Sequence, residues 1–438
     1  MNPFDIEFKI HSLIKFAIPS ILMMFFLSIY TIIDGIFISN FVSTTALSAT
    51  NMVYPFISIV LAIALMLGSG GSAIVGKNLG EEKKKLARRR FTMIVFIAVI
   101  LGIIFAIVGN IYIDKILHIM GVTETQYELG KTYLSVLLLF SPAIFLQACF
   151  QSFTVTSGLP TKGLILTAWA GITNIVLDYV FIVPFKMGIL GAAIATGLGY
   201  TVAAVLGIYI FLNKENLLHF SKFSIEPKVL LKTCSNGASE MITNAAISVT
   251  TFLFNIIFLR YYGEDGVASI TIILYYQFIF SAIQFGYSAG IAPIVSYKYG
   301  EKNLPQLKRI MKLSLIFISL MSVALYGISL ISAKFVFQVF ADTSSNVYKI
   351  SIYGLPIFAV SFLFMGIGIF ASGWYTALSD GRTSGFISFS RTFLLLVISL
   401  IVLPTIFGPL GVWLAVPVAE LIGLVLSCTI LYKKRGIV

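Results

Sequence analysis

Two stretches of this sequence, GGSAIVGKNLGE at residues 70–81 and GIAPIVSYKYGE at residues 290–301, match each other at a separation of 220 residues. The identical positions are Gly70, Ile74, Val75, Gly80 and Glu81 in the first stretch and Gly290, Ile294, Val295, Gly300 and Glu301 in the second. The same shift aligns Pro184, Leu190, Gly191 and Ala195 with Pro404, Leu410, Gly411 and Ala415. One register therefore holds over a long segment, which predicts that the chain consists of two related halves.

The composition indicates an integral membrane protein. Of the 438 residues, 58% are hydrophobic and 11% are charged, and the mean hydropathy is +0.98, whereas soluble domains carry about 25% charged residues. Because unpaired backbone groups are not tolerated in lipid, apolar runs of about 20 residues predict helices. We expect an all-α fold with twelve spans at residues 13–39, 51–76, 91–113, 132–157, 163–183, 188–212, 233–259, 267–296, 310–333, 350–378, 384–403 and 411–432.

Six helices per half place both halves in the same orientation across the membrane. We therefore expect two six-helix bundles related by a pseudo-two-fold axis along the membrane normal, an arrangement found in transporters. The expected domains are an N-terminal bundle at residues 1–212, a cytoplasmic linker at 213–231 and a C-terminal bundle at 232–438.

The net charge of +12 is distributed unevenly between the two sides of the membrane. With twelve crossings, 23 of the 30 Lys and Arg residues fall on the side of the termini, seven of them in KNLGEEKKKLARRR at residues 77–90. This bias predicts that both termini are cytoplasmic in the plasma membrane. No basic domain is present to bind nucleic acid, so the basic runs are expected to contact the lipid bilayer.

The stretch TNIVLDYVFIV at residues 173–183 reads as a membrane helix, yet it carries Asp178 and, one turn earlier, Asn174. A carboxylate in hydrocarbon costs at least about 2.5 kcal/mol. With the two six-helix bundles and the Gly-Glu pair after each second helix, this Asn-x-x-x-Asp pattern resembles the MATE (multidrug and toxic compound extrusion) family, in its bacterial MepA-like branch. The resemblance covers essentially the full length.

The resemblance implies a hinge in the first helix at Pro19 and an ion-coupling site of Asp34, Asn174, Asp178 and Thr196. It also implies coupling to H⁺ or to Na⁺ at these four residues, with no cofactor. Some members bind sodium in the second half through an acid in helix 10, which has no carboxylate in this chain. A sodium site in the second half is therefore not expected.

The predicted helix ends support a common depth for these residues. Asp34 and Asp178 each lie six residues before the outer end of a helix, and Thr196 lies eight residues after an outer start. At 1.5 Å per residue, all three are roughly 9–12 Å below the outer end. Asn174 shares the helix face of Asp178. We expect a buried cation site, and the alternative is that the acids cap neighbouring backbone or hydrogen-bond to Asn174.

Other polar residues within the spans allow two interpretations each. Glu240 and Arg391 are expected to form a structural ion pair, with a coupling role as the alternative. Glu420 is either a pairing acid or a drug- or proton-binding one. Adaptable or polar side chains within the spans predict a substrate cavity. The alternative is that these side chains serve helix packing and interhelical hydrogen bonding. The residues concerned are Met52, Tyr54, Gln147, Gln151, Met241, Tyr276, Gln277 and Met365.

The leading functional hypothesis is a monomeric secondary active transporter that exports lipophilic cationic drugs or dyes in exchange for H⁺ or Na⁺. The alternative is a flippase for a lipid-linked saccharide. A diphosphate cargo would require several basic residues within the spans, where only Arg391 lies away from a span end. An intramembrane hydrolase is the third hypothesis, because GYSAG at residues 286–290 matches a nucleophile motif. That motif requires a strand-to-helix turn and a base, neither of which is predicted here, so the chain is not expected to be an enzyme.

Overall fold

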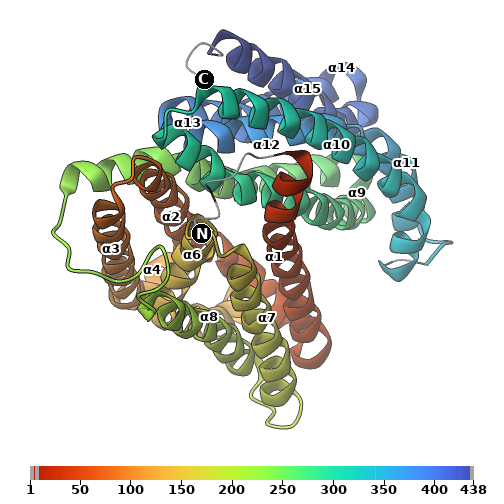
Figure 1. Ribbon diagram of the computed structural model, residues 1–438. Coiled ribbons are helices and arrows are strands. Elements are labelled where there is room, and N and C mark those ends of the chain that lie inside the picture. Colours follow the sequence, from red (N-terminus) through yellow and green to blue (C-terminus); the bar gives the residue numbers. More distant parts are fainter. Residues whose placement is uncertain (1–3, 5–8, 341, 435–438) are drawn as a thin grey trace.

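The computed structural model describes residue 4, residues 9–340 and residues 342–434, and this part of the chain contains helices and no strands. The N-terminal half occupies the lower left of Figure 1. Its helices are α1 (Ile10–Phe37), continued by the short π-helix η1 (Ile38–Val42), α2 (Thr44–Gly80), α3 (Lys84–Ile111), α4 (Ile113–Ile119), α5 (Glu124–Leu139), α6 (Ser141–Thr156), α7 (Pro160–Ile182) and α8 (Gly188–Leu212).

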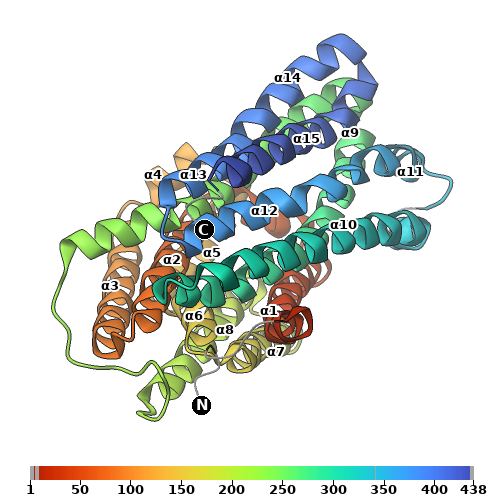
Figure 2. The same cartoon turned by 45° about the horizontal axis from the view of Figure 1, so that its top comes forward.

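The C-terminal half occupies the upper right of the same view and lies above the N-terminal half in Figure 2. Its helices are α9 (Pro227–Gly300), α10 (Leu304–Phe340), α11 (Asn346–Ala359), α12 (Ser361–Ala377), α13 (Gly381–Phe389), the π-helix η2 (Ser390–Leu394), α14 (Leu395–Phe407) and α15 (Pro409–Lys433).

The described helices make up the twelve predicted spans. Nine helical stretches are long and apolar enough to cross a membrane, and α5 with α6 and α11 with α12 form two further spans, bent by 56° and 49°. The 74-residue α9 is interrupted at Gly263, where φ is 68° and ψ is −160°. Residues on both sides of this break, such as Leu259 and Thr271, line one pocket. The helix therefore folds back into two arms, each long enough to be a span.

The 220-residue repeat of the sequence is also a repeat of the structure. The bends of the two broken spans fall at Phe140 and Val360, which are separated by this shift. Gly188 and Gly408 begin equivalent spans with φ of +59° and +57°. Glycine adopts these angles without steric cost. The two halves therefore share the same spans and the same turns.

The two halves meet most closely where α2 crosses the second arm of α9. A Cβ atom on Gly80 would lie 1.9 Å from the carbonyl oxygen of Tyr297, and one on Gly300 would lie 2.1 Å from the carbonyl oxygen of Lys77. Tyr297 and Gly300 are the repeat counterparts of Lys77 and Gly80. Reciprocal contacts of this kind are those of a two-fold interface, so the pseudo-two-fold axis passes through this glycine pair.

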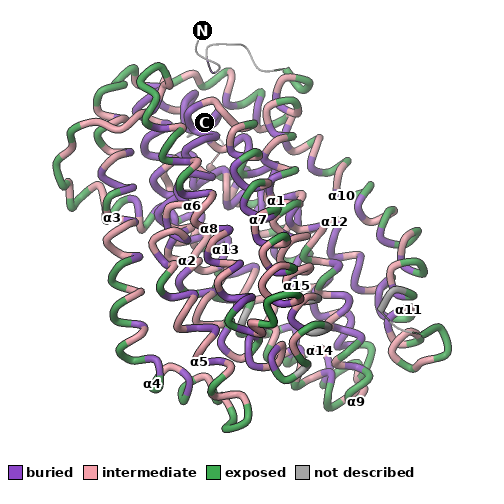
Figure 3. The backbone as a smooth tube through the Cα atoms, turned by 90° about the horizontal axis from the view of Figure 1, so that it is seen from below, coloured by how far each residue is buried: buried purple, intermediate pink, exposed green. Residues whose placement is uncertain are grey.

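The halves are in tight contact at the end that carries the turns at residues 81–83 and 301–303, which we call the basic end. There a Cβ atom on Gly237 of α9 would lie 2.0 Å from the carbonyl oxygen of Met66 on α2. Figure 3 shows α4 and α11 far apart at the opposite end. The molecule is thus closed at the basic end and divergent at the other.

Two arginines of α3 bind the segment that connects the two halves. Arg88 Nε donates a hydrogen bond of 3.0 Å to the carbonyl oxygen of Leu217. Arg90 forms an ion pair of 3.0 Å with Glu226, directly before α9. These cationic side chains therefore fasten residues 213–226 to the N-terminal half.

The glycine contact at the axis predicts the effect of larger residues there. Gly80→Leu and Gly300→Leu would each place a side chain against a backbone carbonyl, which cannot turn aside as a flexible side chain does. Overpacking of this kind costs about 1–3 kcal/mol. We expect both variants to melt at a lower temperature in detergent than the unmodified protein. Gly327→Leu is the control, because a Cβ atom on Gly327 has nothing within 4 Å. Unchanged melting in both axis variants would contradict the contact.

Candidate functional site

A polar cluster joins α1, α7 and α8 in the N-terminal half. Asn174 Nδ2 donates a hydrogen bond of 3.2 Å to Thr196 Oγ1. Thr196 Oγ1 in turn donates a longer one of 3.4 Å to Asp34 Oδ1. The Asp34 and Asp178 carboxyl groups lie close enough to interact electrostatically. The structure therefore brings together the four residues that the sequence placed at one depth.

Asp178 lacks the partners that a buried carboxylate requires. Its side chain is fully buried, at 0% relative exposure. Neither carboxyl oxygen has a hydrogen-bond donor among the described residues, and the amide oxygen of Asn174 has none either. Since burying an unpaired charge is costly, these oxygens form an acceptor set suited to a proton or a hard cation. No described backbone N–H caps Asp178, whereas the other part of the alternative, an interaction of the acids with Asn174, is present.

Small residues allow this close approach of helices. A Cβ atom on Gly199 of α8 would lie 2.9 Å from the carbonyl oxygen of Ala170 and 3.3 Å from Cβ of Asn174. A Cβ atom on Gly171 would lie 2.8 Å from the ring of Tyr30. The glycines thus let α8 and Tyr30 pack directly against α7, which carries Asn174 and Asp178.

Tyrosines surround the two acids, and sequence reasoning missed three of them. Tyr30, Tyr133 and Tyr200 each interact electrostatically with Asp34. Tyr30 precedes Asp34 by four residues and Tyr200 follows Thr196 by four, so helical spacing was a usable signal for both. No local pattern indicates Tyr133, which reaches the cluster from α5.

Pro19 lies within α1, which continues as a helix on both sides of it. Proline removes one backbone hydrogen bond of the helix. The second arm of α9 packs against the same turn, since a Cβ atom on Gly286 would lie 2.5 Å from Cα of Ile21. The GYSAG motif is thus a packing surface for α1, and its serine, Ser288, lies within a helix. The role of Pro19 as a hinge stays a prediction.

The buried charges of the C-terminal half pair differently from the prediction. Arg391 Nη1 donates a hydrogen bond of 3.0 Å to Glu420 Oε1, with side chains only 5% and 10% exposed. Glu240, the predicted partner, interacts with Arg391 electrostatically. Arg391 lies in the π-helix η2, and a Cβ atom on Gly368 would approach its Cδ to 2.6 Å. Which acid Arg391 faces depends on how its helix and the helix of Glu420 are rotated about their axes, and the sequence does not indicate this rotation.

The predicted cavity residues divide into accessible and buried ones. Tyr54 is 47% exposed, and three others are partly accessible, namely Met52, Met241 and Gln277. The remaining four are buried, namely Gln147, Gln151, Tyr276 and Met365. Gln151 donates a hydrogen bond of 3.0 Å to Thr167, and Tyr276 donates one of 3.3 Å to the carbonyl oxygen of Ser329. These last two therefore serve interhelical bonding in this conformation.

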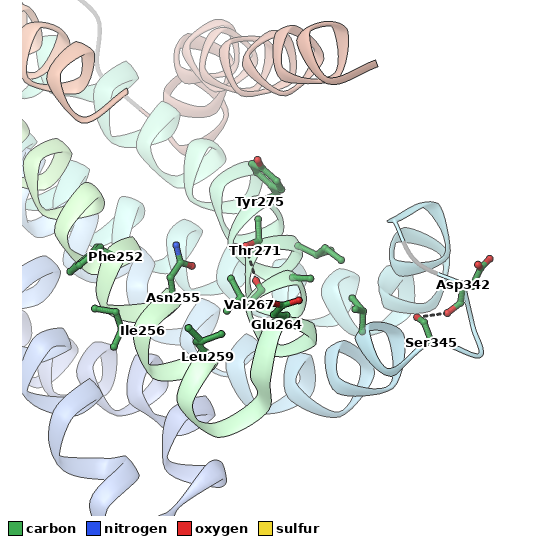
Figure 4. A pocket seen from close by; sticks show the side chains of 13 residues that line it. Phe252, Asn255, Ile256, Leu259, Glu264, Val267, Thr271, Tyr275, Asp342 and Ser345 are labelled. Carbon is green, nitrogen blue, oxygen red and sulfur yellow. Dashed lines mark hydrogen bonds between the residues drawn. The ribbon is translucent and has the colours of Figure 1, made fainter. Parts of the chain in front are cut away.

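A pocket of about 1040 Å³ opens between the two arms of α9 and the start of α11, at the end opposite the basic end. Figure 4 shows its wall of Phe252, Ile256 and Val267, with the acids Glu264 and Asp342 beside it. None of the eight predicted cavity residues lines it. Sequence reasoning missed the pocket because it arises only when α9 folds back at Gly263.

Three tyrosines lie near one another between the pocket and the acid cluster. Tyr275 lines the pocket and is close to Tyr54 of α2. Tyr54 is close to Tyr30, which is close to Asp34.

Comparison with known proteins gives consistent matches over the whole chain. The model of the MatE family matches residues 19–180 and 240–402. The multidrug export protein MepA of Staphylococcus saprophyticus subsp. saprophyticus is 22% identical over 431 residues, which cover 97% of this chain and 93% of that protein. MepA of Staphylococcus haemolyticus is 23% identical over 434 residues, covering 97% and 94%.

The fold is similar to a solved structure described as the outward-facing conformation of a multidrug resistance MATE family transporter of the MOP superfamily. That similarity has a TM-score of 0.91 at 21% identity and covers 97% of this chain and 95% of the other.

The Arg391–Glu420 pair predicts a non-additive effect on stability. Arg391→Met leaves Glu420 buried without its partner, and removing one member of such a pair costs about 3–5 kcal/mol. Arg391→Met combined with Glu420→Leu removes both charges and is expected to be much less destabilising. The measurement is thermal unfolding of the two single variants, Arg391→Met and Glu420→Leu, and of the double variant in one detergent. A loss in the double variant equal to the sum of the two single losses would show that the pair is not energetically coupled.

Proposed function

Because this chain belongs to the MatE family, whose members are transporters rather than enzymes, we propose that it is a secondary active multidrug efflux transporter of the plasma membrane. It exports lipophilic cationic compounds in exchange for H⁺ or Na⁺ by alternating access. The observation that carries this proposal is the fully buried, unpartnered carboxyl group of Asp178 beside Asp34. We propose that it acts as a monomer.

The coupling ion binds at Asp34, Asn174, Asp178 and Thr196. Two interacting carboxyl groups take up a proton as a pair rather than as separate sites. The carboxyl, amide and hydroxyl oxygens of the same residues equally suit Na⁺ as hard ligands. In either case the ion removes the cost of unpaired negative charge in a water-poor site.

The cargo is a lipophilic cation. The pocket at the outer end has an apolar wall and two acids, Glu264 and Asp342, and no basic residue is among its lining residues. The tyrosines between this pocket and Asp34 offer ring faces that attract cations. The flippase alternative is less well supported, because Arg391 is bound to Glu420 and so is not free to bind a diphosphate.

The ion and the drug exclude each other through helix α1. With the basic end in the cytoplasm, the described conformation is closed toward the cytoplasm and faces outward. Ion entry from outside neutralises the acids, repacks α1 and lowers the affinity for the cationic drug. By linkage, drug binding lowers the affinity for the ion by the same factor.

The acid pair is tested by neutral isosteres. Asp34→Asn and Asp178→Asn keep the side-chain volume but cannot gain and lose the ion. We expect efflux of a fluorescent cation driven by a pH or Na⁺ gradient in liposomes to fall by at least about tenfold, which corresponds to about 1.4 kcal/mol on the barrier of the transport cycle. Asp114→Asn is the matched control, because Asp114 is an exposed acid that pairs with Lys131 at 2.8 Å. Full gradient-driven efflux by the Asp178→Asn protein would refute the assignment.

The hinge is tested at the two internal prolines of the first two helices. Pro19→Ala restores a backbone donor within α1 and stiffens the helix. We expect slower efflux with little loss of drug binding. Pro55→Ala makes the same change inside α2 and is expected to leave the rate closer to that of the unmodified protein. If Pro19→Ala transports at the unmodified rate, α1 does not need this proline to move.

A further inference from the structure

A second hollow lies on the outside of the N-terminal half, away from the acid cluster. It has a volume of about 520 Å³ and runs between the start of α7 and the end of α8. Its walls are apolar, with Ile165 and Leu166 on one helix and Leu206 and Tyr209 on the other. Tyr209 is 77% exposed. Such exposure of apolar and aromatic surface on a membrane helix faces lipid, so the hollow opens to the bilayer.

The hollow follows from the way in which α7 and α8 cross. The helices approach closely at Gly199, where the carbonyl oxygen of Ala170 would lie 2.9 Å from an added Cβ atom. Leu206 is seven residues beyond this crossing, which is about 10 Å along the helix. Between the crossing and the basic end, the two helices therefore leave an apolar groove that is lined by large side chains.

One end of the groove is polar. It is lined there by Lys162, in the first turn of α7, and by Asn213, directly after α8. Lys162 is half-buried, and among the described residues its ammonium group has no ion-pair or hydrogen-bond partner. Arg88 and Arg90 at the same end are bound within the protein. Lys162 thus offers an uncompensated charge beside an apolar groove.

We propose that this groove binds an anionic phospholipid, with an acyl chain between α7 and α8 and the phosphate on Lys162. The occupant is a lipid because the apolar part of the groove faces the bilayer and the charged part lies at its surface. The basic end faces the cytoplasmic leaflet, which is rich in anionic lipids, and basic pockets between helices on that side bind their headgroups. The proposal concerns lipid binding alone and stands independently of the transported substrate.

The chain contains a natural reporter for this site. Trp169 lies one helical turn from Ile165 on the same face of α7 and is 54% exposed. The other two tryptophans, Trp374 and Trp413, are 2% and 0% exposed. Brominated acyl chains quench tryptophan on contact, so quenching from the membrane reports mainly on Trp169. Trp169→Phe is expected to remove most of the quenchable signal.

The experiment uses the full chain in phosphatidylcholine vesicles that contain a rising fraction of brominated phosphatidylglycerol or brominated phosphatidylcholine. We expect half-maximal quenching at about a fivefold lower fraction of the anionic lipid, the preference that one lysine near an anionic surface contributes. Equal quenching curves for the two lipids would overturn the proposal.

Variants that change the charge of Lys162 test whether this residue causes the preference for the anionic lipid. Lys162→Glu is expected to abolish it, and Lys162→Gln, which removes the charge without reversing it, is expected to reduce it. Arg382→Glu is the matched control, because Arg382 is the repeat counterpart of Lys162 and lies at the start of α13. The Arg382→Glu protein is expected to prefer phosphatidylglycerol as strongly as the unmodified protein does. An undiminished preference in both Lys162 variants, or a loss of equal size in Arg382→Glu, would place the lipid elsewhere.

Discussion

The cost of an unpaired carboxyl group in a low-dielectric interior is the constraint that organises the N-terminal half. Asp178 is fully buried, and neither of its oxygens has a donor among the described residues. The cost of burying an unpaired charge is the reason for proposing that an ion neutralises Asp178. Asp34, Asn174 and Thr196 would add oxygen ligands to the proposed site. In this proposal, occupancy by the ion and the packing of α1, α7 and α8 are linked.

The symmetry of the two halves explains how such a local event reaches the rest of the molecule. Gly80 and Gly300 meet at the pseudo-two-fold axis through reciprocal contacts with Tyr297 and Lys77. The same glycine-rich arm of α9 packs against α1 beside Pro19. A movement of α1 at the acid cluster would therefore alter the contact surface between the two halves. In an alternating-access cycle, this is the contact that has to open.

Much of this architecture was predictable from the sequence, since hydropathy and the 220-residue repeat depend on local composition. The predicted span at 188–212 coincides with α8, while the predicted spans at 233–259 and 267–296 are two arms of α9 separated at Gly263. The grouping of Asp34, Asn174, Asp178 and Thr196 was expected from the resemblance to the MATE family, and the common depth of Asp34, Asp178 and Thr196, calculated from the rise per residue, supported it. The partner of Arg391 was not predictable, since it depends on the rotation of η2 and α15. Neither was the pocket at the fold of α9, whose walls come from segments that meet only in three dimensions.

The most direct test of the central claim, that ion and drug compete through the acid cluster, is equilibrium binding of a fluorescent lipophilic cation to the purified protein without any gradient. Affinity is measured across a pH series at constant Na⁺ and across a Na⁺ series at constant pH. The account predicts that affinity falls at least about fivefold as one of these two ions becomes more concentrated, a coupling of about 1 kcal/mol, and that Asp178→Asn removes this dependence. An affinity that stays constant across both series in the unmodified protein would contradict it.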